Sequence, residues 1–291
     1  MRKKCKGISI NLFYLPALVL FAMFVIYPLL KGVLISFTSW NGYSQNMKFV
    51  GLKNYQRLFS DARVLRAITN TLIYGCGSTL LQNVIGLAYA LFLNRKFFGR
   101  SAVRAIIYIP AMVASLIMGY VMYFFVQYDN GALNDIRLLF GLEKMDFMAN
   151  GDRAVLIMTL INSLQFVGCA MVIYLAGLQN IPQMYEDAAR VDGANAWQRF
   201  RHVTLPLLLP AISSAVVTNL IGGLKLYDII MAMTKGGPGF TSHSMSTLVS
   251  YQYLNNEAAG YSAVIGLAMF ALILILSNIA MTYFNRKESL Q

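Results

Sequence analysis

The side chains that suit binding chemistry in this sequence are neutral amides and hydroxyls inside long apolar stretches. Such groups donate and accept hydrogen bonds without carrying charge, which suits an uncharged, polyhydroxylated solute. Hydrogen bonding between packed membrane helices is the alternative role, and each such bond contributes about 0.6 to 2 kcal/mol. The neutral set comprises Asn70, Thr71, Gln82, Asn83, Asn162, Ser163, Gln165, Ser213, Ser214, Thr218 and Asn219.

Several kinds of chemistry have no sequence support. No Gly-x-x-x-x-Gly-Lys-Ser/Thr loop is present to cradle the phosphates of ATP. The two histidines, His202 and His243, are too few for a metal cluster or a proton relay. The middles of the apolar stretches lack Asp, Glu, Lys, Arg and His, which argues against a proton- or sodium-coupled carrier. We therefore expect no catalytic residues, no metal and no cofactor in this chain.

The composition is that of an integral membrane protein. Hydrophobic residues make up 57% of the chain and charged residues 12%, whereas soluble domains carry about 25% charged residues. Each long apolar stretch can cross a bilayer, which requires about 20 residues. The prediction is an all-α membrane protein with a single domain over residues 1–291. Its six spans cover about 8–36, 67–93, 104–128, 154–178, 205–231 and 259–284.

The distribution of basic residues predicts the topology. Lysine and arginine gather before the first span, after the second, fourth and sixth spans, and they mark the cytoplasmic side. Both termini are therefore expected in the cytoplasm. The net charge of +12 follows this pattern, so we expect no nucleic-acid binding.

A charged segment, residues 179–206, separates the fourth and fifth spans. Pro182 suits the first turn of a helix, and Glu186 and Asp187 suit its positive end. Gly193 can end that helix. The pattern predicts a short helix, displayed at the membrane surface, that inserts into a partner protein.

This segment resembles the EAA loop of ATP-binding-cassette (ABC) importer permeases. In that loop an acidic residue and two alanines precede a glycine, and an aromatic residue and Leu-Pro follow. Counting back from Gly193 places the acidic position at Asp187, with Glu186 beside it, so both carboxylates remain candidates. The resemblance implies that the segment docks on an ATPase. The coupling residues that it implies are Glu186, Asp187, Ala188, Ala189, Asp192, Gly193, Leu205 and Pro206.

A second stretch, from Tyr227 to Gly239, resembles a segment of permeases for oligosaccharides and glycerol phosphates. It contains an aspartate followed by Met-Thr-Lys-Gly-Gly-Pro. Asp228 has two open roles. It can cap the fifth span and pair with Lys225, or it can contact the solute directly.

Together, these resemblances imply a permease subunit of a binding-protein-dependent sugar importer of the maltose and multiple-sugar class, with the type I (MetI-like) fold. In the maltose importer the spans on either side of the EAA loop line the sugar. At comparable depth the substrate-pathway candidates are Asn162, Gln165, Phe166, Asn219, Gly222 and Gly223.

The implied partners are a second homologous permease, two copies of a cytoplasmic ATPase that bind ATP and Mg, an extracellular or periplasmic sugar-binding protein, and membrane lipids. The implied location is the bacterial cytoplasmic membrane. Two alternatives stay open, namely import of glycerol 3-phosphate or another polyol by the same fold, and an ATP-independent carrier or channel.

Overall fold

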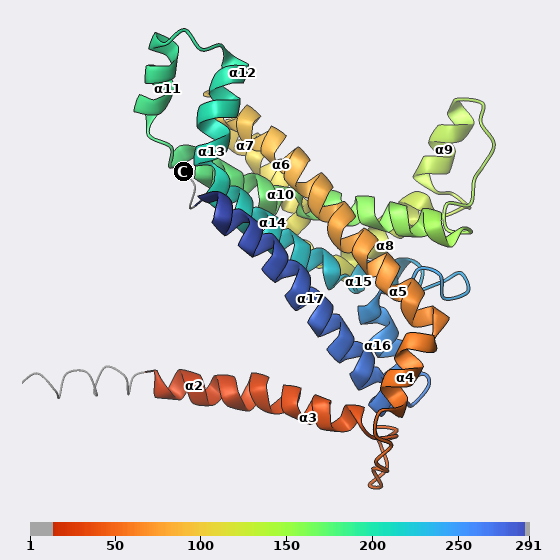
Figure 1. The fold of residues 1–291 in the computed structure, drawn as a ribbon. Coiled ribbons are helices and arrows are strands. Elements are labelled where there is room, and N and C mark those ends of the chain that lie inside the picture. The colour runs from red at the N-terminus through yellow and green to blue at the C-terminus, as the bar shows by residue number, and fades with distance from the viewer. Residues whose placement is uncertain (1–13, 289–291) are drawn as a thin grey trace, which may run out of the picture. The chain divides into compact units, whose positions relative to one another are not determined.

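The computed structural model describes residues 14–288, whose regular secondary structure is helical, with one isolated β-bridge between Thr38 and Phe49 and no strand among them (Figure 1). The chain forms two compact units. The first combines Met1–Asp61 with Val249–Ala268, and the second combines Ala62–Leu248 with Met269–Gln291.

The first unit begins with one apolar helical segment. It runs without interruption from Leu15 to Ser36 through α2 (Leu15–Phe21), η1 (Ala22–Ile26, a π-helical turn) and α3 (Tyr27–Ser36). Residues 8–13 of the expected first span lie outside the described part of the chain. The short helix α4 (Lys53–Ser60) is joined to the end of α3, because Asn54 Nδ2 donates to the carbonyls of Ser36 and Thr38 at 2.9 and 2.8 Å.

The second unit contains most of the remaining helices. In chain order these are α5 (Ala62–Leu72), η2 (Ile73–Gly77), α6 (Ser78–Asn94), α7 (Arg100–Met112), α8 (Ser115–Val126), α9 (Ala132–Leu139), α10 (Gly151–Gln179), α11 (Gln183–Val191), α12 (Ala196–Arg199), η3 (Phe200–Thr204), α13 (Leu205–Leu207), α14 (Leu209–Leu224) and α15 (Asp228–Met233). Two further helices, α16 (Met245–Leu254) and α17 (Ala259–Glu288), contribute residues to both units.

Five helical segments of the described residues are long and apolar enough to cross a membrane. They are Leu15–Ser36, Ala62–Asn94, Gly151–Gln179, Leu209–Met233 and Ala259–Glu288. Each overlaps one of the stretches predicted as spans, because a long uncharged stretch can satisfy its backbone groups in lipid only by forming a helix.

The third predicted span, 104–128, is not one straight helix. It is broken into α7 and α8, whose axes are bent by 98°. Val113 and Ala114 are extended at the break, with ψ of 133° and 132°. The amide Nε2 of Gln165 on α10 donates to the Val113 carbonyl at 3.0 Å. The structure thus differs from the expected continuous span, because a side chain of a neighbouring helix replaces the lost backbone partner.

Helix α10 is the centre of the second unit, where it packs against α6, α7 and α14. One apolar cluster joins α6, α10 and the start of α14 through residues such as Leu93, Tyr174 and Leu208. A second cluster joins α8, α10 and α15 through residues such as Val126, Met158 and Ile229. The two helices that carry the predicted substrate-pathway residues, α10 and α14, are therefore held against each other.

Candidate functional site

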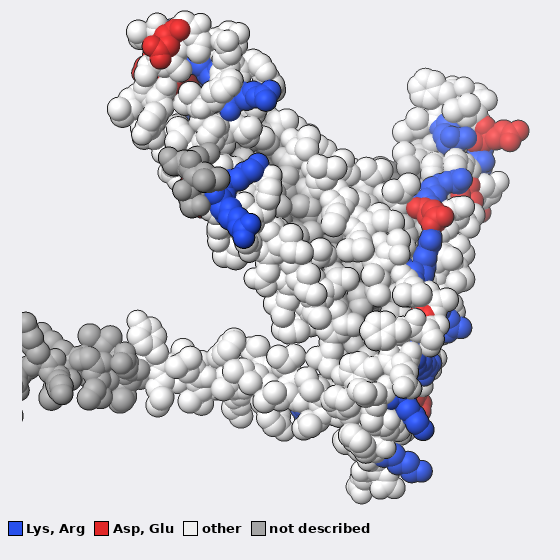
Figure 2. Space-filling view, in the orientation of Figure 1, with Lys and Arg blue, Asp and Glu red and all other residues white. Residues whose placement is uncertain are grey.

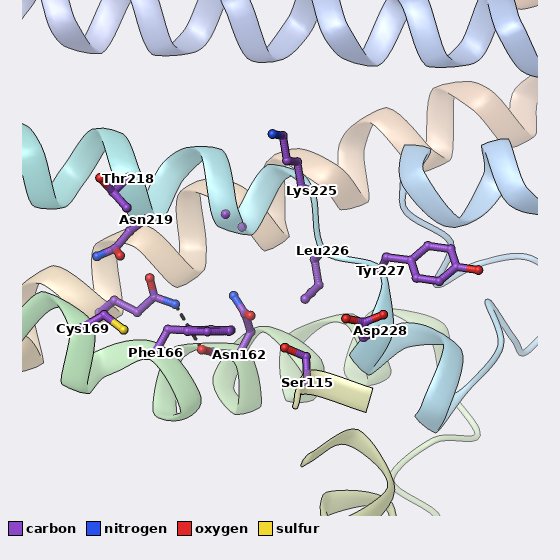
Figure 3. A pocket seen from close by; sticks show the side chains of 13 residues that line it. Ser115, Asn162, Phe166, Cys169, Thr218, Asn219, Lys225, Leu226, Tyr227 and Asp228 are labelled. Atoms are coloured by element: carbon purple, nitrogen blue, oxygen red, sulfur yellow. Dashed lines mark hydrogen bonds between the residues drawn. The ribbon is translucent and has the colours of Figure 1, made fainter. Parts of the chain in front are cut away.

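A cavity of about 400 Å³ lies within the second unit, between α6, α10, α14, the first residue of α8 and the turn that follows α14 (Figure 3). We call it the central pocket. Its lining residues are Gln82, Ser115, Asn162, Phe166, Cys169, Thr218, Asn219, Gly222, Gly223, Lys225, Leu226, Tyr227 and Asp228.

The central pocket brings together five of the six substrate-pathway candidates, namely Asn162, Phe166, Asn219, Gly222 and Gly223. Asn162, Phe166 and Cys169 come from positions i, i+4 and i+7 of α10 and therefore share one helix face. Gln165 does not line the pocket, because its side chain is turned to the break between α7 and α8.

Two deeply buried amide side chains line the pocket, and each has one polar atom without a hydrogen-bond partner in the described part of the chain. Gln82 is 2% exposed and Asn219 is 7% exposed. Gln82 Nε2 donates to the Asn162 carbonyl at 3.1 Å, the dashed line in Figure 3. Within the described residues, Gln82 Oε1 and Asn219 Nδ2 have no partner. A buried polar atom without a partner is costly, and a solute hydroxyl can satisfy both an acceptor and a donor.

The pocket also has an aromatic wall. Figure 3 shows the Phe166 ring between the side chains of Cys169 and Asn162. An aromatic face beside amides suits a sugar ring, whose C–H face is apolar and whose rim is polar. This combination has the chemistry that a neutral, hydroxyl-rich solute requires.

Two charged residues stand where the pocket meets the turn after α14. Lys225 points away from Asn162 and Phe166, and Asp228 points in a different direction (Figure 3). No ion pair joins Lys225 and Asp228 in the part of the chain that the structure describes, so the predicted pairing is not formed. Asp228 was a candidate because of the resemblance carried by the stretch from Tyr227 to Gly239. No sequence pattern indicated that Ser115 or Cys169 would line the cavity.

Gly222 and Gly223 have different surroundings. A methyl group at Gly222 would meet nothing within 4 Å. A methyl group at Gly223 would lie 2.5 Å from Ser78 Oγ and 3.0 Å from both the Tyr74 carbonyl oxygen and Gly75 Cα. Gly223 therefore permits the close approach of α14 to η2 and α6, whereas Gly222 leaves space beside the pocket.

The predicted coupling residues form a separate element, α11 to α13, at one end of the second unit (Figure 1). Helix α11 ends at Val191 with Asp192 as its C-cap, after which Gly193 adopts φ of +77°. The Gly193 N–H donates to the Arg190 carbonyl at 3.1 Å, and the Ala194 N–H donates to the Ala189 carbonyl at 3.0 Å. This is the Schellman ending that glycine favours.

No residue of α11 is buried. Met184, Ala188 and Val191 are exposed and lie at i, i+4 and i+7, so they form one apolar face, and Val191 is 88% exposed. Asp187 lies three residues after Met184 and borders this face, whereas Glu186 is partly buried and faces α6 and α12. The two candidate carboxylates therefore point to different surroundings.

A capping box starts α12. Asn195 Oδ1 accepts from the Gln198 N–H at 2.9 Å, and Gln198 Oε1 accepts from the Asn195 N–H at 2.8 Å. Leu205 and Pro206 lie in α13 and are partly buried. The chain thus leaves α11 through a glycine turn, and a capping box starts the helical stretch that leads through η3 and α13 to α14. We call the segment of residues 179–206 the coupling segment.

Among residues 14–288, no group of three or more His, Cys, Asp or Glu side chains could hold a metal ion. Neither the central pocket nor the coupling segment pairs a nucleophile with a base. The arrangement can bind a neutral solute and contact a partner protein.

Comparisons with known proteins agree with this geometry. Residues 82–289 match the family described as binding-protein-dependent transport system inner membrane component. The chain is 30% identical to a probable starch degradation products transport system permease protein of Thermoanaerobacterium thermosulfurigenes, with 99% of each chain covered. It is 33% identical to a multiple sugar-binding transport system permease protein of Streptococcus mutans, with 91% of each covered.

The chain is also similar to a third sequence relative and to a solved structure. The trehalose/maltose transport system permease protein of Thermococcus litoralis is 32% identical over 90% of this chain and 89% of its own length. In fold, the chain resembles a bacterial ABC transporter involved in alginate import, with a TM-score of 0.82, 23% identity, and coverage of 97% of this chain and 96% of that one.

Proposed function

The chain belongs to the family of binding-protein-dependent transport system inner membrane components, and we propose that it is the permease subunit that carries an uncharged oligosaccharide across the membrane. The family assignment confirms the resemblance to sugar importer permeases. The likeness to the alginate transporter chain confirms the all-α permease fold.

The lining of the central pocket supports the proposal that the solute is an uncharged sugar. Its free acceptor on Gln82 and free donor on Asn219 suit hydroxyl groups, and Phe166 supplies an apolar wall. The relatives' printed names, which refer to starch degradation products, multiple sugars and trehalose or maltose, support a carbohydrate. The one lysine at the pocket points away from Asn162 and Phe166, which favours a neutral sugar over a phosphorylated polyol.

The coupling segment, residues 179–206, supports the proposal that a separate ATPase drives transport. Exposing an apolar helix face to water is unfavourable in free energy. Burial of that face in a matching cleft of a partner protein removes the unfavourable exposure. We assign the docking face to Met184, Asp187, Ala188 and Val191 of α11. ATP and Mg then bind to two copies of a separate cytoplasmic ATPase, and this chain has no catalytic role.

The remaining partners follow from the same proposal. A second homologous permease completes the pathway, and an extracellular or periplasmic sugar-binding protein delivers the solute. The chain resides in the bacterial cytoplasmic membrane with both termini and the coupling segment in the cytoplasm. Transport proceeds by a shift in population between inward-facing and outward-facing states as the ATPase closes on ATP.

Uptake of a labelled maltooligosaccharide by membrane vesicles that carry the whole importer tests this function. The variant Asn219→Leu removes the free donor, so uptake should fall about tenfold. Asn278→Leu is the matched control, because Asn278 is exposed on α17 and its Nδ2 donates to the Leu274 carbonyl of its own helix at 2.8 Å. Uptake that persists after ATP is depleted, or that is equal in the two variants, would contradict the proposal.

A further inference from the structure

A second cavity, of about 620 Å³, lies between the coupling segment and the ends of α6 and α10. We call it the basal pocket. All of its lining residues belong to the second unit, and the transport function proposed above uses none of them as a binding site for a small molecule. They are Leu91, Asn94, Arg95, Leu178, Gln183, Glu186, Arg190, Ala196, Trp197, Arg199, Phe200 and Thr204.

The basal pocket has an excess of positive charge. Three guanidinium groups, those of Arg95, Arg190 and Arg199, line it against the single carboxylate of Glu186. Figure 2 shows basic side chains gathered around this end of the unit, with acidic ones near the tip of α11. An anion placed among these groups would be attracted by more positive charge than it is repelled by negative charge.

The guanidinium groups retain donors for a ligand. Arg95 makes no side-chain hydrogen bond or ion pair with any described residue of the chain. Arg190 reaches Glu186 at 3.6 Å and Asp187 at 3.5 Å, which is longer than the 2.7–2.9 Å of a strong charge-assisted hydrogen bond. Arg199 uses one nitrogen to donate to the Ala194 carbonyl at 2.8 Å, which fixes its position and leaves its other N–H groups available.

An apolar wall accompanies the charges. Leu91 and Leu178 come from the ends of two membrane-spanning helices, and Trp197 and Phe200 pack against each other with ring centroids 5.6 Å apart. A ligand in this pocket therefore meets apolar carbon at one part of the wall and guanidinium groups at another.

We propose that the basal pocket binds a phosphate-bearing anion, either the headgroup of an anionic phospholipid or a soluble phosphate ester. Guanidinium groups bind phosphate oxygens bidentately, and basic pockets between membrane helices bind anionic headgroups. Arg95 stands just after α6, whereas Arg190 and Arg199 stand on α11 and α12. A phosphate bound by all three would link the coupling segment to a spanning helix and limit its movement.

Fluorescence of Trp197 tests this proposal on the full-length chain without any ATPase, so the result is separate from the test of transport. The chain has two tryptophans, and Trp40→Phe leaves Trp197, in the wall of the basal pocket, as the single reporter. The protein is placed in phosphatidylcholine nanodiscs that contain either brominated phosphatidylglycerol or an equal share of brominated phosphatidylcholine. In a second arm, inorganic phosphate is titrated into the protein in an uncharged detergent.

We expect stronger quenching by brominated phosphatidylglycerol, or a saturable fluorescence change with inorganic phosphate if the soluble ester is the ligand. Arg95→Gln and Arg199→Gln should each lower the affinity about fivefold. Arg95→Lys should restore part of it, because the charge returns but the bidentate guanidinium does not. Arg201→Gln is the matched control, since Arg201 is an exposed arginine of the same segment outside the pocket. Equal quenching by the two lipids with no response to phosphate, or an equal effect of Arg201→Gln, would overturn the proposal.

Discussion

The side-chain amide of Gln165 and the backbone carbonyl of Val113 are joined by a hydrogen bond of 3.0 Å at the break between α7 and α8. Val113 is extended, so its carbonyl has left the helical ladder, and Gln165 is 1% exposed. Gln165 is therefore a positioning residue that stabilises the bend, and through the bend it places Ser115 at the central pocket.

Replacing Gln165 by methionine should lower stability by about 1 to 3 kcal/mol, because the partly buried Val113 carbonyl would lose its side-chain donor. Gln82→Met is the matched comparison. Gln82 donates to the Asn162 carbonyl, but Asn162 lies inside α10, where that carbonyl already accepts a backbone N–H. Thermal unfolding of the two purified variants measures the difference, and an equal loss in both would show that the bond to Val113 is not what holds the bend.

Substitutions at Gly222 and Gly223 should separate transport from stability. Gly222→Leu fills open space beside the central pocket, so sugar uptake should fall while the melting temperature stays near that of the wild type. Gly223→Ala forces α14 away from Ser78 and the Tyr74 carbonyl, so the melting temperature should fall by several degrees. Paired uptake and unfolding measurements check this, and the reverse pattern would remove Gly222 from the pathway.

Gly193→Pro should leave membrane insertion intact and uncouple ATP hydrolysis from the presence of sugar. Proline holds φ near −65°, whereas Gly193 has φ of +77°, so the turn after α11 would be reshaped. Gly99→Pro is the control, because Gly99 has φ of +82° and equally open surroundings but lies before α7. ATPase activity of the purified complex with and without sugar is the measurement. If both variants remain coupled, the turn at Gly193 does not transmit motion.

Acid should destabilise the loop that contains His243. Burial lowers the pKa of His243 below its ordinary value of 6.5, and its Nδ1 lies 3.0 Å from Thr247 Oγ1. The unfolded chain takes up the proton first as the pH falls below about 6.5, so this stability is complete above that pH and decreases below it. Melting temperatures at pH 5.5 and 7.5 should differ less in His243→Gln than in the wild type. The exposed His202→Gln variant should keep the wild-type difference.

Residue types and their periodicity predicted much of this structure. Uncharged length located the apolar helices, and the pattern from Pro182 to Gly193 located α11 and its glycine ending. The resemblance to the maltose importer indicated Asn162, Gln165 and Phe166 as pathway candidates, yet Gln165 faces a different neighbour. Pro110 is a local signal near the break at Val113, because it removes a backbone donor inside α7, whereas the hydrogen-bond partner of the Val113 carbonyl lies 52 residues away in the sequence. The orientation of Gln165 and the geometry of the bend depend on tertiary contacts, which sequence periodicity does not reveal.

The most direct test of the central claim is co-purification. A tagged chain is extracted from its native membrane in mild detergent, and the proteins that accompany it are identified by mass spectrometry, for the wild type and for Val191→Glu. Val191 of the α11 apolar face is 88% exposed, and Leu139→Glu on α9, where Leu139 is 85% exposed, is the control.

We expect the wild type and Leu139→Glu to retain a second permease and an ATPase, and Val191→Glu to retain the permease and lose the ATPase. Recovery of the wild-type chain alone in several mild detergents, or retention of the ATPase by Val191→Glu, would contradict the account of a permease subunit coupled through α11.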